Sequence, residues 1–193
     1  MLYEIIFYGR GGQGGVTAAN ILVYAAMYQG LYAQGFPFFG AERRGAPVRA
    51  FARISDKPIL RHGMFNDTDI LVILDHKLAE MDILKQVHVR DNGLVVLNAP
   101  DNYRVKLERF SIGDNVKFYR VDATRIAIEN KLVVAGWPVV NTSMLGALSK
   151  ASGIVSIDNI VKAIKSYFKG RIGEINAVAA KQAYEKTILL EEV

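Results

Sequence analysis

A glycine-rich stretch near the N-terminus limits the folds open to this chain. Residues 7–15 read FYGRGGQGG and overlap the end of LYEIIFY, a β-branched and aromatic run typical of a buried strand. The following VTAANILVYAAMYQG is rich in alanine, contains no proline and ends at Gly30, a residue type common at helix C-termini. The sequence therefore predicts a strand, a glycine-rich turn and a helix in succession.

The rest of the chain alternates between stretches typical of strands and of helices. Strands are predicted at 47–54, 69–75, 94–98 and 116–121, and helices at 76–87, 123–131, 141–152, 156–169 and 173–188. This alternation predicts a single domain over residues 1–193 with a three-layer α/β/α fold. We expect a mainly parallel or mixed sheet, a Rossmann-like glycine-rich first turn and a helical C-terminus.

Local signals add detail to this prediction. The stretch 47–54 alternates apolar and polar residues, which indicates a strand with one face toward solvent. DNG at 91–93 predicts a turn before the next strand. Ser156 is expected to be the N-cap of a helix, and N-cap roles are also the simplest interpretation of Asp69 and Asp75.

The composition excludes several kinds of chemistry. With no cysteine, the chain has no disulfide, no thiolate nucleophile and no cysteine-ligated iron–sulfur cluster. The three histidines, His62, His76 and His88, show no metal-ligand spacing, and no Ser/His/Asp or paired-carboxylate arrangement is present. We therefore expect no catalytic residue and no metal site in this chain. Any redox chemistry requires a group bound from outside.

The remaining composition points to a cytoplasmic protein that does not enter a membrane. No uncharged apolar run approaches the length of a membrane span, and Glu4, Gly9 and Arg10 interrupt the N-terminal stretch that a signal peptide would need. Residues 1–65 hold seven Lys or Arg against three acids, which favours an anionic partner near this third of the chain. The alternative is that these arginines only solvate a surface.

The glycines fit the pattern G-x-G-x-x-G through Gly9, Gly11 and Gly14, with Gly12 in addition. Such a turn exposes backbone N–H groups and a helix N-terminus, which both favour a phosphate. The alternative is that the glycines only permit a tight turn and close helix–strand packing. Either interpretation is compatible with the flanking strand and helix.

The same turn departs from the usual dinucleotide site. That site places an acidic residue about 20 residues after the glycines, whereas the first acid here is Glu42, in a loop rich in Gly and Pro. NAD and FAD are therefore disfavoured. Arg43 and Arg44 leave NADP or another phosphorylated adenosine cofactor open, and coenzyme A belongs to this second group.

The loop that follows, GFPFFGAERRGAPVRAFARIS, contains glycines and prolines that argue against a helix. We expect Phe36, Phe38 and Phe39 to be exposed beside the two arginines, on a surface that contacts a phosphate or a partner. The alternative is a loop folded over its own core.

Trp137-Pro138 is interpreted as a packing and turn element, and Asn141 as a residue that caps a helix or lies at a subunit interface.

Four segments in order resemble the γ subunit of the 2-oxoacid:ferredoxin oxidoreductases, the family of pyruvate synthase. They are YGRGGQGGVTAANIL, FFGAERRGAPVRAFARIS, NDTDILVILD and NTSMLGALSKASG, and the resemblance covers nearly the whole chain. It implies a share in the conversion of a 2-oxoacid, coenzyme A and oxidised ferredoxin to acyl-CoA, carbon dioxide and reduced ferredoxin. Pyruvate is the expected oxoacid.

The resemblance also implies where the cofactors lie. Thiamine diphosphate and the iron–sulfur clusters belong to partner α, β and δ subunits, ferredoxin accepts the electrons, and the γ region is associated with coenzyme A. The isolated chain is then inactive. On this interpretation the coenzyme A phosphates are bound by Gly9, Arg10, Gly11, Gly12, Gln13 and Gly14. Arg43 and Arg44 are further candidates, for phosphate or for a partner subunit.

Two other functions stay open at this point. One is a stand-alone NADP-dependent reductase, and the other is a module that binds a phosphate ligand or nucleic acid. We expect no nucleic acid, because the N-terminal arginines are spread through glycine and apolar sequence instead of forming a basic stripe on a helix. Since 51% of the residues are hydrophobic, we expect the isolated chain to form homo-oligomers.

Overall fold

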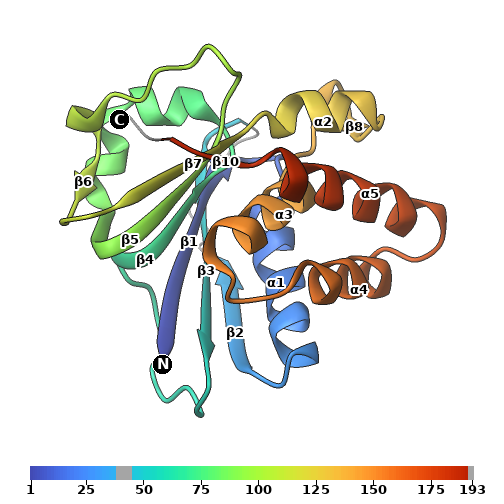
Figure 1. Ribbon diagram of the computed structural model, residues 1–193, viewed down its shortest axis with the longest axis horizontal. Helices are drawn as coiled ribbons and strands as arrows, with labels where there is room; N and C mark the ends of the chain where they lie inside the picture. Colours follow the sequence, from blue (N-terminus) through green and yellow to red (C-terminus); the bar gives the residue numbers. More distant parts are fainter. Residues whose placement is uncertain (38–44, 191–193) are drawn as a thin grey trace.

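The computed structural model describes residues 1–37 and 45–190, which form one α/β domain built on a central sheet (Figure 1). The sheet order is β10-β7-β5-β4-β1-β3-β2, and β6 pairs with β5 off this path. The main strands are β1 Leu2–Arg10, β2 Tyr32–Pro37, β3 Pro47–Ser55, β4 Asp67–Ile73, β5 His88–Asn98 and β7 Lys117–Val121. Short strands are β6 Ser111–Ile112, β8 Val133–Val134, β9 Trp137–Pro138 and β10 Ile188–Leu189.

The sheet is mixed, with a parallel centre. Strands β1, β4, β5 and β7 run parallel to one another, whereas β3, β2 and β10 join antiparallel at the two edges. The expected sheet type is confirmed. The helices are α1 Gly15–Tyr28, α2 Ala123–Glu129, α3 Asn141–Ser152, α4 Ile157–Tyr167 and α5 Arg171–Lys186, with 3₁₀ helices η1 His76–Glu80, η2 Asp82–Gln86 and η3 Leu107–Arg109.

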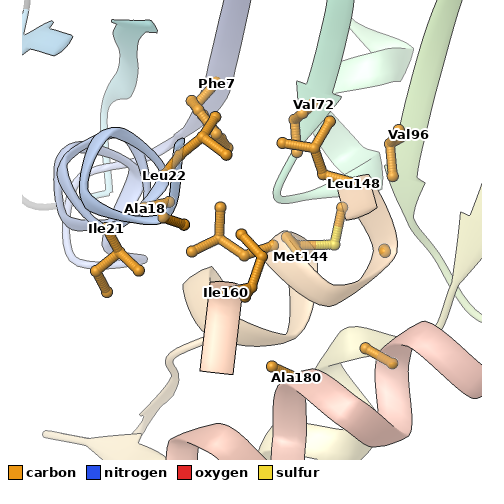
Figure 2. Packing of buried hydrophobic residues seen from close by; sticks show 14 of the residues in the cluster. Phe7, Ala18, Ile21, Leu22, Val72, Val96, Met144, Leu148, Ile160 and Ala180 are labelled. Carbon is orange, nitrogen blue, oxygen red and sulfur yellow. The ribbon is translucent and has the colours of Figure 1, made fainter. Parts of the chain in front are cut away.

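A separate hydrophobic core lies on each face of the sheet, because successive side chains along a strand point to opposite faces. On one face Phe7 and Val72 pack with Leu22 of α1 and Met144 and Leu148 of α3 (Figure 2). On the other face Ile6, Tyr8 and Leu71 pack with residues of η1 and η2. The three layers are therefore long helices, the sheet and a thinner layer of 3₁₀ helices.

Several local predictions are confirmed. Gly30 ends α1 with φ +80, and the N–H of Leu31 donates to the carbonyl of Ala26, as in a Schellman ending. Ser156 caps α4 by accepting from the N–H of Asn159, and Asp75 caps η1 by accepting from Lys77. No helix in the described part of the chain is long and apolar enough to cross a bilayer.

Other local predictions are wrong. Tyr32–Pro37 forms the edge strand β2, which the Gly/Pro content concealed, and Phe36 is half-buried against Phe51 and Phe65 instead of exposed. The stretch 76–87 forms two 3₁₀ helices instead of one helix. DNG lies inside β5, at a bulge where the pairing with β4 shifts between Thr68 and Ile70.

Strand β3 also lacks the predicted solvent-facing side. It lies between β1 and β2, and its residues from Ala50 to Ser55 are all buried. Arg53 is only 3% exposed, because Glu4 pairs with it at 2.8 Å (Oε1 to Nε) and its guanidinium lies 4.6 Å from the ring centre of Phe65. Glu4 also pairs with Arg90. Asp69 is not an N-cap, since its carboxylate accepts from Arg90 and from the N–H of Glu4.

The Glu4 carboxylate is a buried charge with two arginine partners. Burial acts to raise the pKa of Glu4, but the hydrogen bonds and charges of Arg90 and Arg53 outweigh it and hold the pKa below its ordinary value of 4.5. The ionised form is therefore favoured in the folded chain. Its contribution to stability is fully present above the ordinary pKa and is lost as the pH falls through the lower folded pKa.

Glu4→Gln is expected to lower the free energy of unfolding of the full chain by about 3–5 kcal/mol at pH 7, because Arg53 is left buried without its partner charge. Urea denaturation measures this difference, which should shrink as the pH falls below 4.5. The control is Glu129→Gln, which removes an exposed pair with Arg125 and should change little. Equal effects of the two variants at pH 7 would contradict the account.

Candidate functional site

The glycine loop, residues 9–15, joins the carboxyl end of β1 to α1. The N–H of Gln13 donates to the carbonyl of Arg10 at 3.0 Å, and the N–H of Arg10 donates to Oε1 of Gln13 at 2.8 Å. Gln13 is only 8% exposed. Its side chain therefore closes the turn from inside.

Two of the glycines are required by close packing. A Cβ on Gly9 would lie 2.7 Å from Cδ1 of Leu74, and one on Gly14 would lie 2.5 Å from Nδ2 of Asn141. Leu74, fully buried, follows β4, and its N–H donates to the carbonyl of Tyr8 at 2.8 Å. The glycine loop is thus held between the end of β4 and the start of α3. At Gly9 and Gly14 the structure therefore shows the close helix–strand packing that the sequence offered as one interpretation of the glycines.

Gly12 has a different environment. Its φ is +99, and among the described residues, its two chain neighbours aside, no atom lies within 4 Å of the place a Cβ would take. It borders a groove of about 380 Å³, lined by Gly9, Arg10, Gly11, Gly12, Gly14, Gly15, Val16 and Val48. Close packing against the described residues therefore does not explain this glycine.

Two of the glycines that line the groove have backbone N–H groups available for hydrogen bonding in the described part of the chain. Within residues 1–37 and 45–190, the N–H groups of Gly12 and Gly14 form no hydrogen bond. Among the same residues, no side chain caps α1, and its first turn contains no acid. Free N–H groups at the positive end of a helix attract an anion. This arrangement can bind a phosphate without a cationic side chain.

Gly11 is less available than the sequence predicted. Its N–H donates to the carbonyl of Ala46 at 2.9 Å, and its carbonyl accepts from the N–H of Gly45 at 3.1 Å. In a dinucleotide-binding turn the second glycine lets the backbone approach the pyrophosphate. Here residues 45–46 occupy that side of the loop.

Arg10 is fixed beside the groove by an ion pair. Its Nε lies 2.7 Å from Oδ2 of Asp75, and its Nη1 donates to the carbonyl of Gly45 at 3.2 Å. The side chains of Arg10 and Asp75 are 23% and 12% exposed. The charge of Arg10 is therefore largely balanced, and it connects β1, the end of β4 and Gly45.

The structure places the predicted site residues unevenly. Residues 9–14 lie together, whereas Arg43, Arg44, Phe38 and Phe39 lie outside the described residues. No group of three or more His, Asp or Glu side chains in the described part of the chain is arranged to hold a metal ion. Sequence reasoning missed Leu74, Val48 and the pairing of Asp75 with Arg10. Asn141 was noticed only as a possible cap or interface residue.

The profile of the pyruvate ferredoxin/flavodoxin oxidoreductase family matches residues 4–186. This chain belongs to that family. It is 47% identical over 191 residues to the pyruvate/ketoisovalerate oxidoreductases common subunit gamma of Thermococcus litoralis, covering 98% of this chain and 100% of that protein. It is 48% identical over 186 residues to pyruvate synthase subunit PorC of Methanothermobacter thermautotrophicus, covering 96% of each.

A solved structure of the oxidoreductase family has the same fold. The crystal structure of pyruvate oxidoreductase subunit PORC from Thermotoga maritima matches with a TM-score of 0.79 and 33% identity, covering 98% of this chain and 99% of that one. The resemblance seen in the sequence is therefore confirmed, and the chain is a component of an oxidoreductase.

The topology also argues against an NADP-dependent reductase. In a dinucleotide-binding fold, the first helix leads to a parallel strand beside β1 that positions the ribose-binding residue. Here α1 leads to β2 at the edge of the sheet, and antiparallel β3 lies between β2 and β1. The position beside β1, where a dinucleotide-binding fold has the parallel strand with the ribose-binding residue, is therefore occupied by antiparallel β3.

Gly14→Ala tests the packing of the glycine loop, with Gly30→Ala as the matched control. Both glycines have left-handed backbones, with φ +83 and +80, but within the described residues only Gly14 faces a neighbouring side chain. Gly30→Ala should lower the free energy of unfolding by about 1 kcal/mol from backbone strain, and Gly14→Ala by about 1–3 kcal/mol more from the clash with Asn141. Urea denaturation of the full chain measures both. Equal losses would refute the role of Asn141.

Proposed function

We propose that this chain is the γ subunit of a multisubunit 2-oxoacid:ferredoxin oxidoreductase and that its glycine loop holds the phosphates of coenzyme A. Family membership and the names of the similar proteins support the first part. The single observation that supports the second is Gly12, an open glycine whose N–H lies uncommitted at the start of α1. We take pyruvate as the 2-oxoacid, since similar proteins are named for it.

In this proposal the oxidation takes place in other subunits. Partner α, β and δ subunits hold thiamine diphosphate and the iron–sulfur clusters, and ferredoxin accepts the electrons, all in the cytoplasm. This chain has no cysteine to ligate a cluster. Its contribution is to bind and orient one substrate, which is a task of geometry and electrostatics.

The groove suits a pyrophosphate in position and charge. It lies at the carboxyl ends of β1 and β4, the edge at which open α/β sheets bind ligands. The N–H groups of Gly12 and Gly14 supply donors, and the dipole of α1 favours negative charge. The Arg10–Asp75 pair keeps the loop rigid, so little ordering of the backbone is needed when the ligand binds.

Gly12→Asp and Gly12→Asn form a matched pair that tests the phosphate site. Both add a side chain of the same shape at the same strained φ, and only Asp adds negative charge. In the assembled enzyme, Gly12→Asp should weaken coenzyme A binding about a hundredfold, which corresponds to the loss of two charge-assisted hydrogen bonds. Gly12→Asn should weaken it by less than about tenfold.

The KM for coenzyme A in steady-state turnover of pyruvate measures this effect. Release of carbon dioxide from pyruvate without coenzyme A is the control for an intact complex, and it should not change. If the two variants have the same KM, charge at this loop is irrelevant, and the loop serves only as a turn.

The full chain purified alone is expected to be colourless, inactive and self-associated. It has no cluster-ligating cysteine, and it exposes apolar side chains such as Met27, Leu60 and Val134 that partner subunits would cover. Absorption spectra, pyruvate-dependent dye reduction and light scattering measure the three properties. Dye reduction by the isolated chain would contradict the assignment as a non-catalytic subunit. A strict monomer at high concentration would contradict the self-association.

A further inference from the structure

Trp137 is more exposed than expected for a residue that packs in the interior of the protein. It begins strand β9 of the hairpin β8–β9, which lies between α2 and α3 along the chain, and the residue is 40% exposed. The sequence predicted a packing and turn element, and the turn itself consists of Ala135 and Gly136. These have φ values of 49 and 82, the signs found in a type I′ hairpin turn. The neighbouring Val134 is 64% exposed.

The indole of Trp137 lies beside the backbone that covers the glycine loop. Its Cη2, at the far edge of the six-membered ring, is 4.0 Å from the place a Cβ on Gly45 would take. Gly45 in turn donates to the carbonyl of Gly11 and accepts from Arg10. Gly45 carries no side chain to cover the ring, and its φ of +84 disfavours one. A partly exposed aromatic ring therefore lies beside Gly45, which is hydrogen-bonded to the glycine loop.

Trp137 also lies close in sequence to a residue that contacts the glycine loop. Four residues after Trp137, Asn141 begins α3 and packs against Gly14. Pro138 and the two-residue turn limit the freedom of the hairpin, and the N–H of Val139 donates to the carbonyl of Leu132 at 2.8 Å. The ring is thus held by the same segment that supports the glycine loop.

We infer that Trp137 stacks on the adenine ring of coenzyme A while the glycine loop holds its phosphates. This inference rests on the proposed function. The indole is flat and partly exposed, which suits stacking on a planar base, and the exposed Val133 and Val134 make the surroundings apolar. The dinucleotide-type carboxylate for the ribose is absent from the sequence, so recognition of the nucleotide end requires another contact. Stacking supplies that contact without a polar group.

Trp137→Leu and Trp137→Phe test the inference in the assembled enzyme. Leu keeps the apolar bulk but cannot stack, whereas Phe keeps an aromatic face. The KM for coenzyme A should rise about tenfold in Trp137→Leu and less than about threefold in Trp137→Phe. With 4′-phosphopantetheine, which lacks the adenosine, both variants should behave as the wild type does.

The outcomes separate this inference from the proposed function. If Gly12→Asp weakens coenzyme A binding but Trp137→Leu does not, the stacking is wrong and the phosphate site stands. If neither variant changes the KM, both are wrong. If Trp137→Leu raises the KM for 4′-phosphopantetheine equally, the indole does not contact the base. If Trp137→Leu releases the chain from the complex while the assembled fraction keeps its KM, Trp137 contacts a partner subunit, and the inference is overturned.

Discussion

Three segments meet at the carboxyl end of the sheet because Gly9 and Gly14 carry no side chains. Leu74, at the end of β4, fills the space beside Gly9, and Asn141, at the start of α3, fills the space beside Gly14. Protein interiors are packed too densely to accept even one extra methyl group at such contacts without a shift. The position of α1, and with it the direction of the Gly12 and Gly14 N–H groups, depends on these two contacts.

The arginine that lines the groove is paired with an acid. Arg10 is held by Asp75, and Arg53, farther along the sheet, is held by Glu4. A count of basic residues in the N-terminal third therefore overstates the positive charge available to a ligand. What stays available is the backbone, because N–H groups at a helix start carry partial positive charge and the first turn of α1 contains no acid. In our proposal, such a site selects anions by geometry more than by net charge.

The sequence predicted the parts of the fold that depend on local patterns. The strand Leu2–Arg10, the helix Gly15–Tyr28 and the C-terminal helices follow from hydrophobic periodicity and capping residues. The burial of Arg53 was not predictable in this way, because it depends on Glu4, Phe36 and Phe65, which lie far away in the sequence. Strand β2 was missed because it is formed by its pairing with β3, against a Gly/Pro-rich composition.

The candidate site divides in the same way. The G-x-G-x-x-G spacing located the loop, but only the structure separates Gly9 and Gly14, which pack, from Gly12, which is open.

The most direct test is a structure of the assembled enzyme with coenzyme A bound. The account predicts phosphate oxygens within hydrogen-bond distance of the Gly12 and Gly14 N–H groups. Coenzyme A bound with its phosphates elsewhere, and the groove at Gly12 covered by a partner subunit, would contradict it.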